Sequence, residues 1–189
     1  MLTWDELEKT VSDCGRCSLR AGRTNAVIGM GNKNADIMFV GEAPGYYEDL
    51  EGLPFVGKAG QLLDKMLAAI GLDRETVYIA NIVKCRPPDN RDPEPSEQDA
   101  CIPYLKCQML LVKPKIICCL GRISARRIID SGFKITSDRG VWHERKGYHI
   151  IATYHPSALL RDESKKRPAW EDFKSIRDKL HDLGYTVGQ

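Results

Sequence analysis

Apolar residues along this 189-residue chain gather in four short runs, each about as long as a buried β-strand. The runs lie at Asp36 to Val40, Val77 to Val83, Lys115 to Leu120 and His149 to Tyr154. Between them, apolar residues recur at the spacing of helices. The chain therefore predicts strands that alternate with helices.

Helical spacing is clearest from Leu62 to Ile70, where an apolar stripe ends at Gly71, a common stop signal. Ser96, with Asp99 three residues later, predicts a capping box that opens a helix toward Leu111. Two further helices are predicted, at Ile123 to Ile129 and at Trp170 to Leu183.

This alternation indicates an α/β fold with a central four-stranded, mostly parallel sheet and helices on both faces. The sequence shows no internal repeat and no low-complexity linker, so residues 1–189 are expected to form a single domain. The proline-rich segment from Lys84 to Gln98 is interpreted as an ordered loop rather than a domain boundary.

Ligands of open α/β sheets bind beyond the carboxyl ends of the strands. Four such ends can be read here, and they carry Gly41 to Gly45, Asn81, Gly121 with Arg122, and His155 to Ser157. Glycines at a strand end allow a ligand to approach the main chain closely. A glycine loop, an amide, an arginine and a histidine are thus expected to converge on one edge of the sheet.

The chain has seven cysteines, a high and odd number. Cys118 and Cys119 lie in an apolar strand and Cys107 in a helical stretch, so these three are expected to pack as small hydrophobic residues. The remaining four are Cys14, Cys17, Cys85 and Cys101.

Cys14 and Cys17 form a two-residue-spaced pair, while Cys85 and Cys101 flank the proline-rich loop. Zinc and an iron–sulfur cluster both accept four cysteines, so the spacing leaves the metal open. A redox dithiol and plain reduced thiols are the alternatives. A four-cysteine centre would tie the N-terminal segment to the core and contribute to folding rather than to chemistry.

Composition is that of an ordinary soluble protein, with 42% hydrophobic and 29% charged residues and a net charge of +2. The N-terminal MLTWDELEKT lacks the pattern of a signal peptide, and no apolar run reaches membrane-spanning length. A cytoplasmic, monomeric protein without a membrane partner is expected.

Taken together, these motifs resemble the family 4 uracil-DNA glycosylases, the iron–sulfur type of that superfamily. The resemblance rests on GEAPG at Gly41 to Gly45, GLPFVGKAGQLLDKML from Gly52 to Leu67, NIVKCRPPDNRDP from Asn81 to Pro93, the His155-Pro-Ser triplet and the four cysteines. It covers about residues 14 to 161. It implies a three-layer fold and a [4Fe–4S] cluster on those cysteines.

The resemblance also implies an activity: excision of uracil from single- or double-stranded DNA during base excision repair. The N-glycosidic bond is hydrolysed and an abasic site remains, with no lyase step. Such an enzyme must flip the nucleotide out of the base stack into a pocket, and it would associate with the nucleoid while acting.

By the same resemblance, the main chain of Gly41, Glu42 and Ala43 lines the uracil pocket, and Phe55 stacks on the base. Asn81 reads the uracil edge, because a carboxamide both donates to a carbonyl and accepts from the ring N–H. His155 would hydrogen-bond the uracil oxygen on which charge develops.

Family 1 relatives place an aspartate at the position of Ala43 to orient the attacking water, which leaves water activation open here. Glu42 is the preferred water-positioning or electrostatic group. Exclusion of thymine needs a wall near the C5 position, for which Glu48 is favoured over Tyr46 and Tyr47.

For DNA contact, Ser157 and Arg161 are expected to hold flanking phosphates, and Ala158 and Leu159 are candidates to fill the vacated stack. Basic residues cluster nearby, at Lys165 to Arg167 and at Arg122, Arg126 and Arg127.

Two other functions remain open: a glycosylase for a different damaged base, and a non-catalytic iron–sulfur module that tethers a repair or replication partner to DNA. Relatives that trap DNA covalently carry a glutamine in place of Ala43 and a basic insertion before His155. Neither is present, so turnover is expected.

Overall fold

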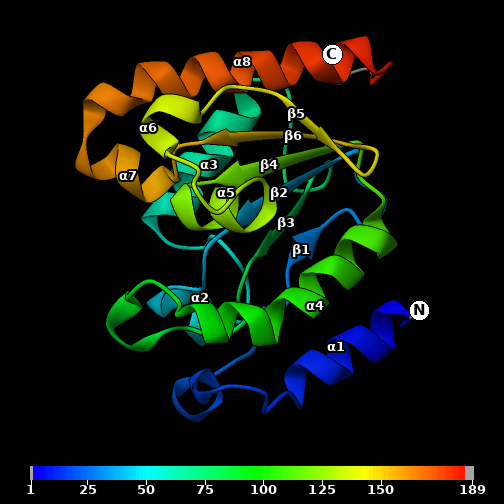
Figure 1. Cartoon of the computed structure of the whole chain (residues 1–189), viewed down its shortest axis with the longest axis vertical. Helices are drawn as coiled ribbons and strands as arrows, with labels where there is room; N and C mark the ends of the chain where they lie inside the picture. Colours follow the sequence, from blue (N-terminus) through cyan, green and yellow to red (C-terminus); the bar gives the residue numbers. More distant parts are fainter. Residues whose placement is uncertain (1, 186–189) are drawn as a thin grey trace.

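The computed structural model describes residues 2–185, so both ends of the predicted domain, Met1 and 186–189, lie outside the described residues. One six-stranded sheet forms the centre, in the order β1-β3-β2-β4-β6-β5 (Figure 1). The strands are β1 (Met30–Gly31), β2 (Ile37–Gly41), β3 (Tyr78–Asn81), β4 (Ile116–Leu120), β5 (His143–Arg145) and β6 (Tyr148–Thr153).

The four predicted strands are the central ones, β3, β2, β4 and β6, and all three pairings among them are parallel. The predicted count of four strands is wrong, because β1 and β5 add antiparallel edges to β3 and β6. These edge strands are only two and three residues long. Neither contains an apolar run, so hydrophobic pattern alone does not reveal them.

The described chain also contains eight α-helices and three short 3₁₀ helices. The α-helices are α1 (Trp4–Ser12), α2 (Tyr46–Glu51), α3 (Lys58–Ala68), α4 (Pro95–Val112), α5 (Arg122–Ile128), α6 (Ile135–Asp138), α7 (Pro156–Arg161) and α8 (Lys166–Asp182). The 3₁₀ helices are η1 (Ser18–Gly22), η2 (Pro88–Asn90) and η3 (Glu163–Lys165).

Helices cover both faces of the sheet, which gives three layers (Figure 1). Successive residues of a strand point to opposite faces, so each central strand contributes side chains to the hydrophobic cores on both faces of the sheet. Phe39 packs with α3 and α8 on one face, while its neighbours Met38 and Val40 pack with α1 and α4 on the other. Cys118 and Cys119 divide in the same way and are fully buried, as predicted.

Helix α4 is formed as predicted, but its capping differs. Glu94 is the N-cap, and its backbone N–H donates to the Glu97 carboxylate at 2.7 Å. Ser96 and Asp99 therefore do not form the predicted capping box. Glu97 is fixed in turn by two hydrogen bonds from the Arg91 guanidinium, at 2.9 and 2.7 Å. Within residues 2–185 no helix has the length and apolar character needed to cross a membrane.

Candidate active site

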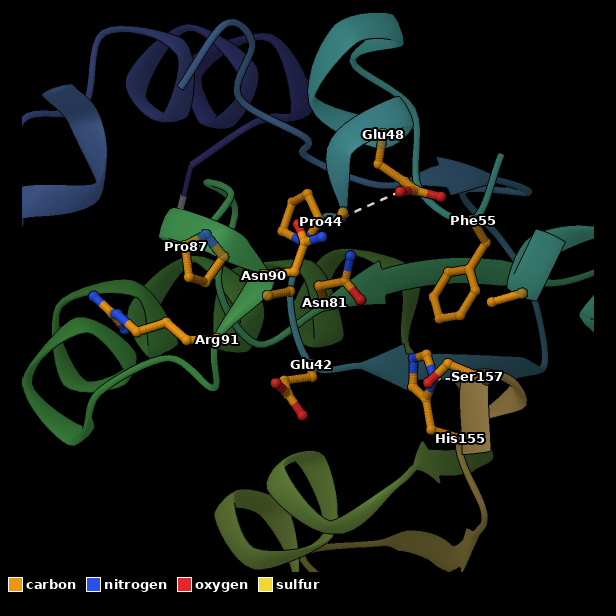
Figure 2. A pocket seen from close by; sticks show the side chains of 13 residues that line it. Glu42, Pro44, Glu48, Phe55, Asn81, Pro87, Asn90, Arg91, His155 and Ser157 are labelled. Carbon is orange, nitrogen blue, oxygen red and sulfur yellow. Dashed lines mark hydrogen bonds between the residues drawn. The ribbon is translucent and has the colours of Figure 1, made fainter. Parts of the chain in front are cut away.

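A cavity of about 210 Å³ opens at the carboxyl ends of the central strands. Its walls come from the exits of β2, β3 and β6 and from the loops that follow α2 and β3 (Figure 2). The lining residues are Glu42, Ala43, Pro44, Gly45, Glu48, Phe55, Ala59, Asn81, Pro87, Asn90, Arg91, His155 and Ser157. The structure thus brings three of the four predicted strand ends together in one cavity.

Gly41 ends β2 directly behind this cavity, paired with Asn81 of β3. A Cβ atom at position 41 would lie 2.4 Å from the Asn81 Oδ1 atom and 2.7 Å from Cζ of Phe55. Both distances are far below van der Waals contact. Glycine is required here because the side chains of Asn81 and Phe55 pass over the bare backbone.

Phe55 is held in an unusual backbone conformation, with φ of 55°. That left-handed conformation is costly for a bulky residue and persists only when the surroundings fix it. The Arg74 guanidinium donates to the carbonyl oxygens of Pro54 and Phe55 and forms an ion pair with Asp64. Gly60 lets the Phe55 carbonyl pack against the next helix, since a Cβ there would lie 1.7 Å from that oxygen.

The clamped Phe55 ring stacks against the imidazole of His155, with 5.4 Å between ring centroids and 29° between planes. His155 lies between β6 and α7, and its Nδ1 accepts a hydrogen bond from the Ser157 backbone N–H at 3.1 Å. Nδ1 is therefore the acceptor nitrogen, and the proton is on Nε2. Desolvation, then Arg161, lowers the pKa of His155 to about 4, so the ring is neutral at pH 7.

Asn81 is almost fully buried, with 2% of its surface exposed, and its side-chain Oδ1 has no hydrogen-bond partner. The other such buried atom within residues 2–185 is His143 Nε2, which lies on β5 away from the cavity lining. An unpaired buried carbonyl costs about 1–3 kcal/mol. At the cavity wall, this oxygen can accept a hydrogen bond from a ligand.

Behind Asn81, the buried Lys84 ammonium donates to the Asn81 main-chain oxygen at 2.8 Å and to Gln108 Oε1 at 2.6 Å. Gln108 in turn donates to the carbonyl of Ile28 and to the Tyr78 hydroxyl oxygen. Burial lowers the pKa of Lys84 to about 8. This network fixes the turn that presents Asn81, and the sequence pattern gave no sign of it.

Glu42 lines the cavity opposite His155 (Figure 2). Desolvation, with a smaller contribution from the nearby Asp92 carboxylate, raises its pKa to about 7. Arg122 and Arg161 act in the opposite direction. Arg122 also forms an ion pair with Asp92. Glu42 can therefore exchange a proton near neutral pH.

Glu48 joins two loops of the cavity through its carboxylate. One oxygen accepts the backbone N–H groups of Val56 and Gly57, at 2.9 and 3.0 Å, and the other accepts that of Gly45 at 3.1 Å. Its place in the lining is compatible with the predicted C5 wall, which stays a prediction. Tyr46 and Tyr47 are exposed and do not line the cavity.

The four predicted ligand cysteines, Cys14, Cys17, Cys85 and Cys101, line a second cavity between α1, α4 and the loop after β3. No disulfide joins them. The Arg23 guanidinium donates to the Cys85 sulfur at 3.1 Å, and the Lys84 backbone N–H donates to the Cys101 sulfur at 3.3 Å. Such donors stabilise negatively charged sulfur ligands.

The four cysteines share one cavity, which is compatible with a common centre, although within residues 2–185 no group of three or more potential ligands is arranged to hold a metal ion. The [4Fe–4S] cluster therefore stays a prediction. Burial raises the pKa of Cys101 to about 11. As a free thiol, Cys101 would therefore be a poor nucleophile.

Comparison with known proteins identifies the relatives of this chain. Residues 28–174 match the family model of the uracil DNA glycosylase superfamily. A type-4 uracil-DNA glycosylase of Sulfurisphaera tokodaii is 46% identical over 97% of this chain and 90% of the relative. One from Archaeoglobus fulgidus is 45% identical over 93% and 92%, and one from Saccharolobus solfataricus is 44% identical over 97% and 89%. The chain belongs to the type-4 uracil-DNA glycosylases.

For this glycosylase, one predicted DNA contact needs correction. Leu159 is 2% exposed and packs against Tyr154 and Ala169, so it is not available to a DNA stack. Its neighbour Leu160 is 48% exposed. The error arose because the sequence alone does not show which face of the short helix α7 packs against the protein and which face is exposed. Ser157 lines the cavity and Arg161 lies exposed at the end of α7.

Several residues of the glycosylase site were not predicted. Pro87, Asn90 and Arg91 line the cavity, Asp92 lies beside Glu42, and Arg74 fixes Phe55. The loop from Lys84 to Gln98 carried a usable signal, because it contains one predicted cluster ligand, Cys85, and lies between Asn81 and a second ligand, Cys101, each three residues away. No sequence feature pointed to Arg74.

Proposed function

We propose that this cavity binds a uracil flipped out of DNA, and that the enzyme hydrolyses the N-glycosidic bond and leaves an abasic site. The observation that carries the proposal is the unpaired, buried Asn81 Oδ1 at the wall of a cavity that also contains a neutral histidine. A flipped base is the substrate of enzymes that act on DNA bases.

The site recognises uracil through the flat face of the base and through its hydrogen-bonding edge. The Phe55 ring offers an aromatic surface to the base. The Asn81 Oδ1 accepts the ring N3–H, and the amide NH₂ of the same side chain donates to the O4 carbonyl. Cytosine has an acceptor at N3 and a donor at position 4, so the same amide orientation cannot pair with it. A site built around such a pair rejects the wrong base strongly.

His155 supports departure of the base. As the C1′–N1 bond breaks, its electron pair goes to uracil, and negative charge develops on the O2 oxygen. The Nε2–H of a neutral imidazole can donate to that oxygen, because Ser157 already occupies Nδ1. A preorganised donor at developing charge typically contributes about 10²–10³ in rate.

Glu42 is suited to the attacking water. A water oxygen bonds to C1′ and one of its protons passes to the Glu42 carboxylate, whose pKa of about 7 matches this task. Ala43 leaves the position next to Glu42 without a polar side chain. Because water is the nucleophile, no Schiff base with the sugar forms, and the reaction is monofunctional without a lyase step.

Cys14, Cys17, Cys85 and Cys101 would hold a [4Fe–4S] cluster. When bound, the cluster supplies a covalent link between the segment after α1 and the loop after β3 that borders the active site. Its contribution is to folding and to the position of that loop.

The activity is tested with a labelled 30-mer duplex that carries one uracil, followed by alkaline cleavage. Strand breakage at uracil but not in a thymine-containing duplex is expected. A His155→Ala protein should react about 10²–10³ times more slowly. His181→Ala, which alters an exposed histidine of α8, is the matched control. Breakage at neither base by protein that contains the cluster would refute the proposal.

A further inference from the structure

Helix α2, next to the active-site cavity, has an inverted distribution of polar and apolar side chains. Two of its three acidic residues point inward: Glu48 accepts three backbone N–H groups, and the buried Asp49 accepts those of Thr24 and Asn25, whereas Glu51 at the end of the helix is exposed. Its tyrosines point outward, with Tyr46 50% and Tyr47 60% exposed. Surface helices ordinarily do the reverse.

The outward tyrosines lie next to cavity residues in the sequence. Two apolar residues that follow them, Leu50 and Leu53, are also exposed, at 48% and 41%. Tyr46 directly follows Gly45, and Tyr47 precedes Glu48, two residues that line the cavity. Exposed apolar surface of this kind usually marks a binding site. Its place at the cavity rim indicates that it meets the same macromolecule that enters the cavity.

The tyrosine rings are held in fixed positions. They contact each other edge to face, with 5.3 Å between centroids. The Arg86 guanidinium lies over the Tyr46 ring at 5.0 Å. Arg86 is itself fixed by a 2.8 Å hydrogen bond to Asn90, which also lines the cavity. Sites for unpaired nucleotides combine aromatic faces with arginine side chains that contact the bases.

We propose that Tyr46, Tyr47 and Arg86 form a stacking platform for the unpaired nucleobase that adjoins the flipped uracil. This inference rests on the proposed function, because it assumes that uracil occupies the cavity. An aromatic face can stack only on a base that is not paired and stacked in a duplex. The platform therefore favours single-stranded or locally opened DNA.

The chemistry of α2 favours a base over other occupants. Helix α2 has no basic residue, and its one exposed charge is the carboxylate of Glu51, so α2 offers little to attract a phosphate. Affinity at this point must therefore come from the aromatic faces. Base–aromatic stacking tolerates any sequence, which suits an enzyme that must find uracil in every context.

The test measures binding of single-stranded 15-mers by fluorescence anisotropy. Each contains a 2′-fluorinated deoxyuridine, whose glycosidic bond resists hydrolysis. One oligonucleotide is intact, and two carry an abasic spacer on the 5′ or the 3′ side of the uracil. The proteins are wild type, Tyr46→Leu/Tyr47→Leu and Tyr46→Phe/Tyr47→Phe. Trp170→Leu, which alters an exposed aromatic residue of α8, is the control.

One of the two spacers is expected to weaken binding to wild type about tenfold, and the phenylalanine variant should respond equally. The leucine variant should bind the intact strand about tenfold more weakly and respond less than twofold to the spacer. An equal spacer effect in the wild-type and leucine proteins would overturn the platform. If instead wild type binds the uracil strand no better than a thymine strand, the proposed function itself fails.

Discussion

Replacing Glu42 by glutamine tests the electrostatics of the active site most directly. The pKa of Glu42 rises from 4.5 to about 7 in the folded protein. Folding therefore favours its protonated form. The contribution of Glu42 to stability is present in full below pH 4.5 and is lost as pH rises through 7. At about 1.36 kcal/mol per pH unit, the ionised carboxylate costs about 3 kcal/mol above pH 7.

Glutamine removes this cost and can still donate a hydrogen bond to Asp92, as the protonated acid does. At pH 8 the substitution should stabilise the protein by about 3 kcal/mol, roughly 6–12 °C in Tm. At pH 5 the gain should fall to about 1 kcal/mol, because the carboxyl group of the folded wild type is then already protonated. Differential scanning calorimetry at both pH values measures the difference.

Activity should change in the opposite direction. The single-turnover rate of wild type should fall about tenfold per pH unit below pH 7, since only ionised Glu42 accepts the water proton. Glu42→Gln should be slow and independent of pH over this range. Glu51→Gln, which makes the same change at an exposed carboxylate of α2, is the control for the effect of replacing a carboxylate by an amide. An equal Tm gain at pH 5 and pH 8, or an unchanged rate in Glu42→Gln, would refute the reasoning.

Three further predictions concern other parts of the site. Arg74→Lys keeps the charge but loses the planar fork that holds Phe55, so kcat/KM should fall about tenfold in single-uracil kinetics; an unchanged value would mean that Phe55 is held without it. Asn81→Asp loses the donor to O4 and should slow uracil release at least about hundredfold, measured on uracil and cytosine strands side by side; equal uracil rates would remove Asn81 from recognition. Cys101→Ala should abolish the brown colour of the cluster and lower Tm, measured on protein purified without oxygen, whereas Cys107→Ala should keep the colour; a brown Cys101→Ala protein would contradict the ligand assignment.

Much of the central fold could be predicted because it is determined locally. Each parallel strand is an apolar run, and its length limits where the next helix begins. The edge strands differ, since Met30–Gly31 becomes a strand only by pairing with β3. The cap of α4 was misassigned for a similar reason. Glu94 and Glu97 are selected by Arg91, a residue of the preceding loop, rather than by the spacing of Ser96 and Asp99.

The active site divides in the same way. Residues at strand ends, such as Asn81 and His155, could be placed because topology alone sends them to one edge of the sheet. Residues that act through another side chain could not. The effect of Asp92 on Glu42 depends on how the loop after β3 folds back, and the contact of Arg74 with Phe55 spans two loops. Neither of these two contacts produces a hydrophobic periodicity or a motif that can be recognised in the sequence.

Gly41 has a consequence for how this enzyme can change over generations. Every missense mutation of a glycine codon adds at least a Cβ atom, and at this position that atom would collide with both Asn81 and Phe55. No single substitution at position 41 can therefore be accommodated, whatever the new side chain. A lineage that acquires a different base preference must first alter Asn81 or Phe55, and only then can position 41 accept a substitution.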